Sequence, residues 1–208
     1  MQPTVFFSQK LPREAEERER ALSRLCPGKL CLAGQVHGET ILYADHNYTA
    51  RAGDALYTDL PGVFVGVKTA DCVPVLLTSR AAAAAVHAGW RGTARRIAEK
   101  TARLLCETYR LSPEEITAHI GPCICQTCYE TDGEVAEALG PEAAAYIARR
   151  GAKFHPDLRA VNAHWLRNMG LRDIRVSPDC TRCLADVYWS HRAHGSGRGV
   201  QVSWAGDG

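Results

Sequence analysis

The chain has 208 residues, of which 46% are hydrophobic and 23% are charged, and its formal net charge is +2. A chain of this length can bury a core without disulfides and fits a single domain. The small net charge argues against a nucleic-acid or membrane partner. The apolar Val5-Phe6-Phe7 is too short for a signal peptide, and no run approaches the roughly 18 apolar residues of a membrane span. We therefore expect a soluble cytoplasmic protein whose nine cysteines stay reduced.

The first half of the chain predicts one helix followed by short strands. A charged, helix-favouring segment runs from Glu14 to Leu25 and ends at the breaker Cys26-Pro27-Gly28. Apolar runs bounded by Gly, Asp, Asn or Pro predict strands over residues 30–32, 40–43, 63–67 and 73–77. A further strand is expected over residues 81–86, although the alanines of this run favour a helix.

The second half shows a helical period. Apolar residues from Ile97 to Tyr109 recur at helical spacing. Further helices are expected over residues 133–139, 141–150 and 158–169, and strands over 116–120, 174–177 and 200–204. Strands and helices interleave unevenly, and no repeat or linker interrupts them. The sequence therefore predicts one α+β domain with mixed sheets, spanning residues 1–208.

Three short phrases carry residues suited to chemistry: Gln35-Val36-His37-Gly38, Ala70-Asp71-Cys72 and His87-Ala88-Gly89-Trp90-Arg91-Gly92. Cys72 begins one apolar run, His87 ends another, and a glycine closely follows each histidine. The three side chains are therefore candidates to meet at sheet ends. Taken singly, each has a simpler explanation as a hydrogen-bonding histidine or a buried thiol. Together, two imidazoles and a thiolate with a free fourth position are typical of a catalytic zinc site.

These phrases resemble the YfiH-like family, variously labelled polyphenol oxidase (laccase-like), purine nucleoside phosphorylase and peptidoglycan editing factor. The resemblance includes Gly121-Pro122-Cys123-Ile124 with Tyr129-Glu130 and runs from about Leu32 to the C-terminus. It implies a single-domain α/β/β/α sandwich similar to the cytotoxic-necrotising-factor-type deamidases. It also implies one Zn²⁺ held by His37, Cys72 and His87. The implied activities are phosphorolysis of adenosine, inosine and methylthioadenosine, with phosphate as co-substrate, and deamination of adenosine.

The neighbouring side chains suit deamination. A zinc site with three protein ligands produces hydroxide near neutral pH, and hydroxide can attack C6 of adenine if a proton carrier assists the departing ammonia. Asp71 and Glu39 are the acidic residues nearest in sequence, and Asp71 is our candidate catalytic residue beside the trio. Either carboxylate could instead hold the second nitrogen of a ligand histidine.

Phosphorolysis needs an anion site, for which Arg91, Arg192 and Arg198 are the candidate substrate-binding residues, because guanidinium pairs bidentately with phosphate. Trp90 is a candidate to stack on the purine. The simpler explanations are solvated or salt-bridged arginines and a core indole. The segment from Met1 to Pro12 is shorter than is usual in the family and lacks its arginine, paired glycines and Asn-Leu-Gly phrase. Part of the substrate or phosphate wall is therefore expected to be absent, altered or supplied by a partner chain.

Several alternatives stay open. The trio could work without metal, with Cys72 as nucleophile and His87 as base in an amide hydrolase that edits peptidoglycan precursors. A non-catalytic binding module could keep it for stability. Multicopper oxidation is disfavoured, because the eight histidines mostly lie outside any cluster. The sequence leaves open the oligomeric state and whether a further metal is bound by Cys123, Cys125, Cys128, Cys180 and Cys183.

Overall fold

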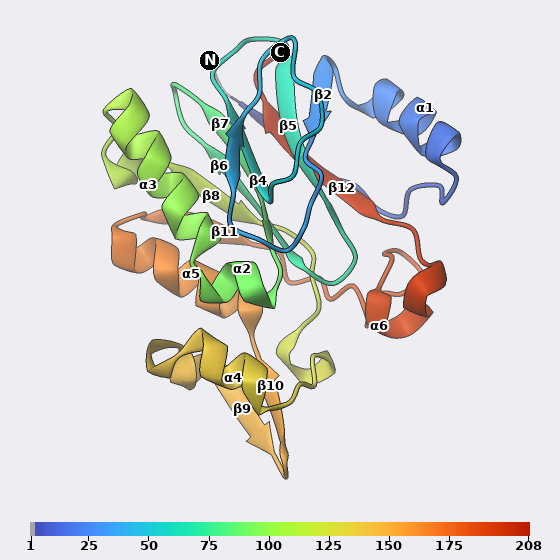
Figure 1. Ribbon diagram of the computed structural model, residues 1–208, viewed down its shortest axis with the longest axis vertical. Helices are drawn as coiled ribbons and strands as arrows, with labels where there is room; N and C mark the ends of the chain where they lie inside the picture. Colours follow the sequence, from blue (N-terminus) through green and yellow to red (C-terminus); the bar gives the residue numbers. More distant parts are fainter. Residues whose placement is uncertain (1–2) are drawn as a thin grey trace.

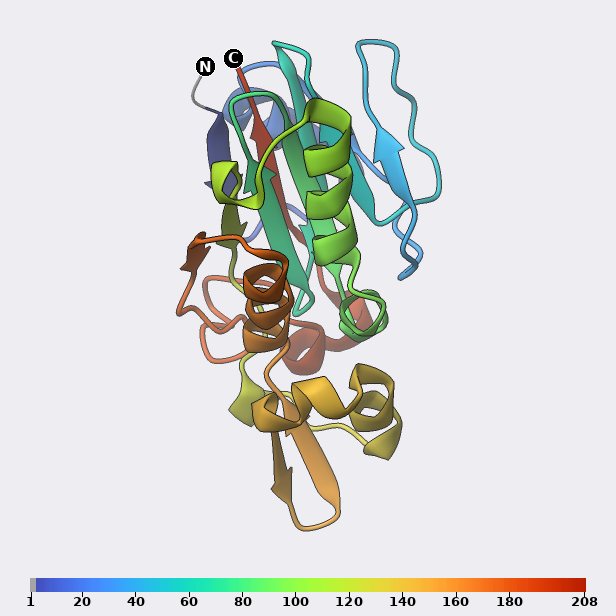
Figure 2. The same ribbon diagram turned by 90° about the vertical axis from the view of Figure 1, so that its left-hand side faces the viewer.

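Two β-sheets packed face to face form the centre of the molecule, as the computed structural model of residues 3–208 shows (Figure 1, Figure 2). The smaller sheet has the order β1 (Thr4–Phe7), β12 (Gln201–Gly206), β5 (Val63–Thr69) and β2 (Lys29–Leu32). The larger sheet has the order β11 (Asp173–Val176), β8 (Thr117–Ile120), β6 (Val73–Thr78), β7 (Ala83–Ala88), β4 (Ala55–Thr58) and β3 (Ile41–Tyr43). Both sheets mix parallel and antiparallel pairs, as the uneven order of elements predicted.

Helices cover the outer face of each sheet. Figure 1 shows α1 (Ala15–Leu25) beside the smaller sheet, and α3 (Ile97–Tyr109) and α5 (Leu158–Met169) beside the larger one. A smaller unit at the far end contains α4 (Gly133–Leu139) and the hairpin of β9 (Ile147–Arg150) and β10 (Lys153–Pro156). The short helices α2 (Trp90–Ala94) and α6 (His191–His194) lie between this unit and the sheets. The layers are therefore helix, sheet, sheet and helix, which confirms the α+β sandwich.

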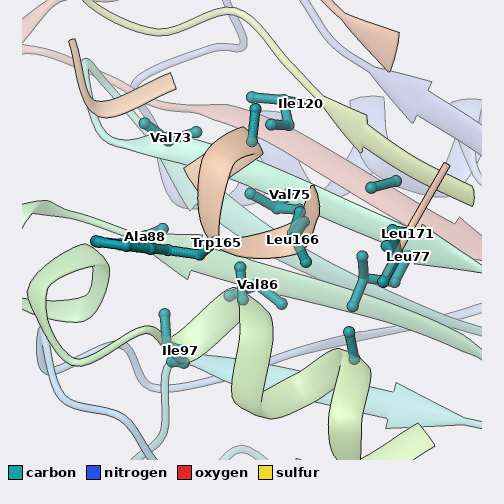
Figure 3. Packing of buried hydrophobic residues seen from close by; sticks show 14 of the residues in the cluster. Val73, Val75, Leu77, Val86, Ala88, Ile97, Ile120, Trp165, Leu166 and Leu171 are labelled. Atoms are coloured by element: carbon teal, nitrogen blue, oxygen red, sulfur yellow. The ribbon is translucent and has the colours of Figure 1, made fainter. Parts of the chain in front are cut away.

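The alternation of side chains along β6 and β7 separates two hydrophobic layers. Val75 and Val86 face the helices and pack in the cluster that contains Ile97, Trp165 and Leu166 (Figure 3). On the opposite face, one further cluster fills the space between the sheets, and its members from β5, β6, β7 and β12 include Val65, Val67, Leu76, Ala83, Ala85 and Ala205. The small alanines of β7 let the sheets approach closely, which explains why this alanine-rich run is a strand.

One predicted element is wrong. Residues 141–150 do not form one α-helix: Pro141–Tyr146 is a 3-10 helix, and Ile147–Arg150 is strand β9. The hairpin partner β10 begins after a two-residue loop that contains Gly151 at φ 60°. Hydrogen bonding across this hairpin overrides the helix propensity of the alanines. The structure also adds β1, β4, β10, α2 and α6, which the sequence did not predict.

The N-terminal segment contributes an edge strand. Of the segment from Met1 to Pro12, Met1 and Gln2 lie outside the described residues, and Thr4–Phe7 forms β1, antiparallel to β12. Within residues 3–208, no helix combines the length and the apolar character that crossing a bilayer requires.

Candidate active site

Cys72 and His87 lie at the same end of two adjacent strands. Cys72 directly precedes β6, His87 is the penultimate residue of β7, and the antiparallel register pairs Pro74 with His87. By strand alternation, His87 shares the face of Ala83 and Ala85, which line the layer between the sheets. Asp71, with φ 91°, forms the strained turn that leads into Cys72. The local structure thus brings both side chains to one end of the inter-sheet layer.

The loop between β2 and β3 presents His37. The side-chain amide of Gln35 donates to the backbone oxygen of Lys68 on β5 and accepts from the backbone N–H of the same residue, both at 2.7 Å. His37 itself adopts φ 58°, a left-handed conformation that non-glycine residues rarely adopt. The Asp54 carboxylate fixes this turn by accepting the backbone N–H groups of Val36, His37 and Gly38 at 3.2, 2.9 and 2.7 Å.

Asp54 connects the loop to the second histidine. It lies just before β4, it is fully buried, and its Oδ1 atom is 2.8 Å from Nδ1 of His87. Because an ionised carboxylate only accepts, Nδ1 of His87 carries the proton, which leaves Nε2 free for a ligand. Burial raises the pKa of Asp54, but hydrogen bonds from His87 and from the backbone of Gly38 and Val36 outweigh it and hold the pKa below its ordinary value.

Asp54 was not among the functional residues predicted from the sequence. Asp71 and Glu39 were the candidates to hold a ligand histidine, and Asp54 fills that role for His87. Glu39 instead pairs with Lys100 at the surface. The available signal for Asp54 was its place in Gly53-Asp54-Ala55-Leu56-Tyr57-Thr58, a phrase that also resembles the family.

The three candidate ligands converge. The ligand atoms of His37, Cys72 and His87 all lie within 4.8 Å of one another. The two imidazole rings meet edge to face with centroids 4.8 Å apart. A Cβ atom at Gly89 would lie 3.2 Å from Cδ2 of His37 and 3.3 Å from Sγ of Cys72, so a larger residue there would press on both side chains. One thiolate and two imidazoles around a common centre fit a metal ion.

Without a metal, Cys72 and His87 of the trio form an ion pair. Burial alone raises the pKa of Cys72, but hydrogen bonds with His37 and His87 outweigh it and lower the pKa to about 6. Burial lowers the pKa of His87, but its bonds with Asp54 and Cys72 raise it to about 9. Near neutral pH, Cys72 is therefore a thiolate beside the imidazolium of His87.

A cavity of about 420 Å³ opens onto His37 and Cys72. The four candidate substrate-binding residues from the sequence also line it: Trp90, Arg91, Arg192 and Arg198. Among the further lining residues, Ile124, Tyr129, Leu158 and His191 were not predicted as site residues, although the first two stand inside a family phrase. The cavity therefore joins the metal-ligand set to residues from four distant segments.

The cavity arginines differ in their contacts. The guanidinium of Arg91 lies over the ring of Trp90 at 4.2 Å from its centroid. That of Arg192 lies 5.1 Å from the centroid of Tyr129 and donates to a backbone oxygen at 2.8 Å. Nε of Arg198 is buried and has no hydrogen-bond partner within residues 3–208. A buried donor without an acceptor costs free energy, so this atom is one of the less favourable contacts around the cavity.

Asp71 also lines the cavity, and both of its carboxylate oxygens accept hydrogen bonds. Oδ1 accepts from the hydroxyl of Thr181 at 2.6 Å, and Oδ2 accepts from the backbone N–H of Arg192 at 2.8 Å. These bonds hold two C-terminal segments against the turn that carries Cys72.

Known proteins share the sequence pattern and the fold of this chain. Residues 12–206 match the family described as multi-copper polyphenol oxidoreductase laccase. "Purine nucleoside phosphorylase YfiH" of Escherichia coli (strain K12) is 33% identical over 189 residues, which cover 87% of this chain and 76% of that protein. "Adenosine deaminase RL5", from an unknown prokaryotic organism, is 41% identical over 155 residues, which cover 70% of this chain and 59% of that protein. The crystal structure of YlmD from Geobacillus stearothermophilus superposes with a TM-score of 0.90 at 26% identity, covering 99% of this chain and 92% of that one. The chain therefore belongs to the YfiH-like family, whose members carry laccase, phosphorylase and deaminase names.

Proposed function

We propose that the protein is a zinc-dependent enzyme of purine nucleosides, acting in the cytoplasm by phosphorolysis of adenosine, inosine and methylthioadenosine and by deamination of adenosine. The observation that carries the proposal is the convergence of His37, Cys72 and His87 at a cavity lined by three arginines. The phosphorylase and deaminase names of the relatives support this substrate class.

The donor set favours zinc. Two imidazoles and one thiolate leave a fourth tetrahedral position, and His37 and Cys72 both border the cavity, which supports an open position on that side. When bound, zinc supplies a Lewis acid that lowers the pKa of water to about 7. Asp54 orients His87, and Gly89 leaves room for His37 and Cys72 to approach. A multicopper cluster has little support, since His37 and His87 are the only histidines that join a metal-ligating group within residues 3–208.

Asp71 is our candidate for proton transfer to the departing ammonia. Asp54 is bound to His87 and Glu39 is bound to Lys100, and neither borders the cavity. Asp71 borders it directly and lies next to Cys72 in the chain. A general acid or base must reach the reacting group within hydrogen-bond distance, and Asp71 is the carboxylate whose position supports this role.

The cavity walls suit the other parts of a purine nucleoside and phosphate. Arg91, Arg192 and Arg198 provide guanidinium groups for a phosphate anion. Trp90 and Tyr129 provide aromatic faces on which a purine can stack. In phosphorolysis, a phosphate oxygen would bond to C1′ of the ribose as the bond from C1′ to the base breaks, giving ribose 1-phosphate and the free base.

The test is incubation of the purified protein with adenosine, inosine or methylthioadenosine, with and without phosphate, followed by product identification. We expect adenine and ribose 1-phosphate from adenosine with phosphate, and inosine without it. The variant His37→Gln should lose both activities, whereas His46→Gln, which changes an exposed histidine outside the trio, should keep them. Unchanged substrates in every condition would overturn the proposal.

The metal-free alternative rests on a separate observation, the thiolate of Cys72 beside the imidazolium of His87. This pair is typical of cysteine hydrolases, including an editor of peptidoglycan precursors. Metal analysis of protein purified without chelators separates the two functions. Stoichiometric zinc that disappears in Cys72→Ala supports the zinc enzyme. A metal-free protein that is rapidly alkylated at Cys72 and still hydrolyses an amide substrate supports the alternative.

A further inference from the structure

Two cysteine pairs lie on turns that leave the larger sheet side by side. Cys125 and Cys128 follow β8, and Cys180 and Cys183 follow β11. Strands β8 and β11 are adjacent and parallel, so their carboxyl ends lie at the same edge of the sheet (Figure 1). Each pair has the C-x-x-C spacing that is typical of a zinc-binding turn.

Backbone contacts continue the pairing of the two strands into the turns. Cys123 and Cys180 form an isolated parallel bridge, and the backbone N–H of Thr181 donates to the backbone oxygen of Cys123 at 3.1 Å. These contacts bring together segments that are 55 residues apart in the sequence. The relative position of the turns is therefore fixed by the sheet and not only by the cysteines.

The four thiols share one centre. All Sγ atoms of Cys125, Cys128, Cys180 and Cys183 lie within 4.8 Å of one another, and those of Cys128 and Cys183 are 3.4 Å apart. Zn–S bonds of about 2.3 Å in a tetrahedron place neighbouring sulfurs about 3.8 Å apart, which falls within this spacing. The backbone N–H groups of Cys125 and Cys183 point at Sγ of Cys180, at 3.3 and 3.4 Å. Such donors stabilise a thiolate.

We propose that Cys125, Cys128, Cys180 and Cys183 bind a second, structural zinc ion with no open coordination position. Four thiolates saturate a tetrahedral ion, which distinguishes this site from the three-ligand trio. The fifth cysteine of the region, Cys123, lies outside the group. Two disulfides are disfavoured because the four sulfurs surround one point, and a four-iron cluster is disfavoured because its core needs wider spacing between the thiolates.

This site supports the wall of the active cavity. Ile124 directly precedes Cys125 and Tyr129 directly follows Cys128, and both border the cavity. Thr181 stands between the other two cysteines and donates to Asp71 at 2.6 Å. A metal that ties the two turns together closes a long loop, which lowers the entropy of the unfolded chain and restricts motion of the wall.

The experiment is metal counting by mass spectrometry on the full chain, purified without chelators. We expect two zinc ions per chain in the wild type, one in Cys72→Ala and one in the double variant Cys128→Ser/Cys183→Ser. The control Cys106→Ser changes a thiol of α3 outside both groups and should keep two. Because Cys72→Ala leaves the second group intact, it gives a result even if the double variant does not fold. Cobalt substituted into Cys72→Ala should show the intense thiolate-to-metal absorption of a tetrathiolate site.

Three outcomes would overturn the proposal: no metal in Cys72→Ala, iron in place of zinc, or loss of two hydrogens from the intact mass, which marks a disulfide. The proposal does not depend on the catalytic zinc. The wild type could instead bind a single zinc ion that is kept in Cys72→Ala and lost in the double variant. That result would support this site and remove the trio as a metal centre. In the double variant, we further expect a higher KM for nucleosides with a smaller change in kcat, because the ligand set of the trio is untouched.

Discussion

Replacing Asp54 with asparagine tests how the site is oriented. Oδ1 of Asp54 accepts from Nδ1 of His87 and from the backbone of His37, and Oδ2 accepts from Val36 and Gly38. Asparagine has only one accepting oxygen, so in either orientation its NH₂ group faces N–H donors. Asp54→Asn therefore weakens either the support of His87 or the turn that presents His37.

The structure gives the size of this effect. Loss of a partner that orients a metal-ligating histidine costs roughly 10–100-fold in metal affinity, or about 1.4–2.8 kcal/mol. Two backbone donors that lose their acceptor destabilise the metal-free fold by about 2 kcal/mol, since the loop is partly open to water. For a chain of this length, that loss lowers Tm by roughly 4–8 °C.

Zinc affinity is measured by competition with a chromophoric chelator at pH 7 and pH 9. The pKa of His87 is raised to about 9 in the wild type, so protons compete with the metal at pH 7 and less so at pH 9. Removing the carboxylate lowers the pKa of His87 and relieves this competition in the variant. The loss of zinc affinity in Asp54→Asn, relative to the wild type, should therefore be larger at pH 9 than at pH 7.

The control is Asp173→Asn, the same chemical change at a surface aspartate that pairs with Arg175. It should leave zinc affinity unchanged. If Asp54→Asn binds zinc within about threefold of the wild type at both pH values, the assigned role of Asp54 is wrong.

Three further predictions concern the same site. Gly89→Ala should weaken zinc binding by pushing His37 and Cys72 apart, since alanine tolerates the φ of −66° at this position. The control Gly197→Ala, where nothing lies within 4 Å of the added Cβ, should leave zinc binding unchanged. Equal zinc affinities of the two variants would contradict the close approach at Gly89. In metal-free protein, the rate of Cys72 alkylation, measured by peptide mass spectrometry, should rise through about pH 6 and level off by pH 8. A rate that still rises at pH 9 would refute the lowered pKa of Cys72. Asp71→Asn should reduce kcat for adenosine deamination by about 100-fold or more with unchanged zinc content, and an unaltered kcat would remove Asp71 as proton carrier.

The sequence alone determined the elements with strong local patterns. The helical period from Ile97 to Tyr109 and the apolar runs around Val75 and Val65 predicted α3, β6 and β5, because burial of one face or both faces of an element leaves its period in the residue order. It also identified His37, Cys72 and His87 as one group, since their residue types and flanking glycines suit a metal site.

The tertiary structure decided which distant residues become neighbours. Asp54 supports His87 across 33 residues because β4 pairs with β7 in the register that sets Ala55 against Val86. The two C-x-x-C turns meet because β8 pairs in parallel with β11. No local period encodes strand partners, since pairing depends on the packing of the whole sheet. For the same reason residues 147–150, helical by composition, became a strand once a hairpin partner was present.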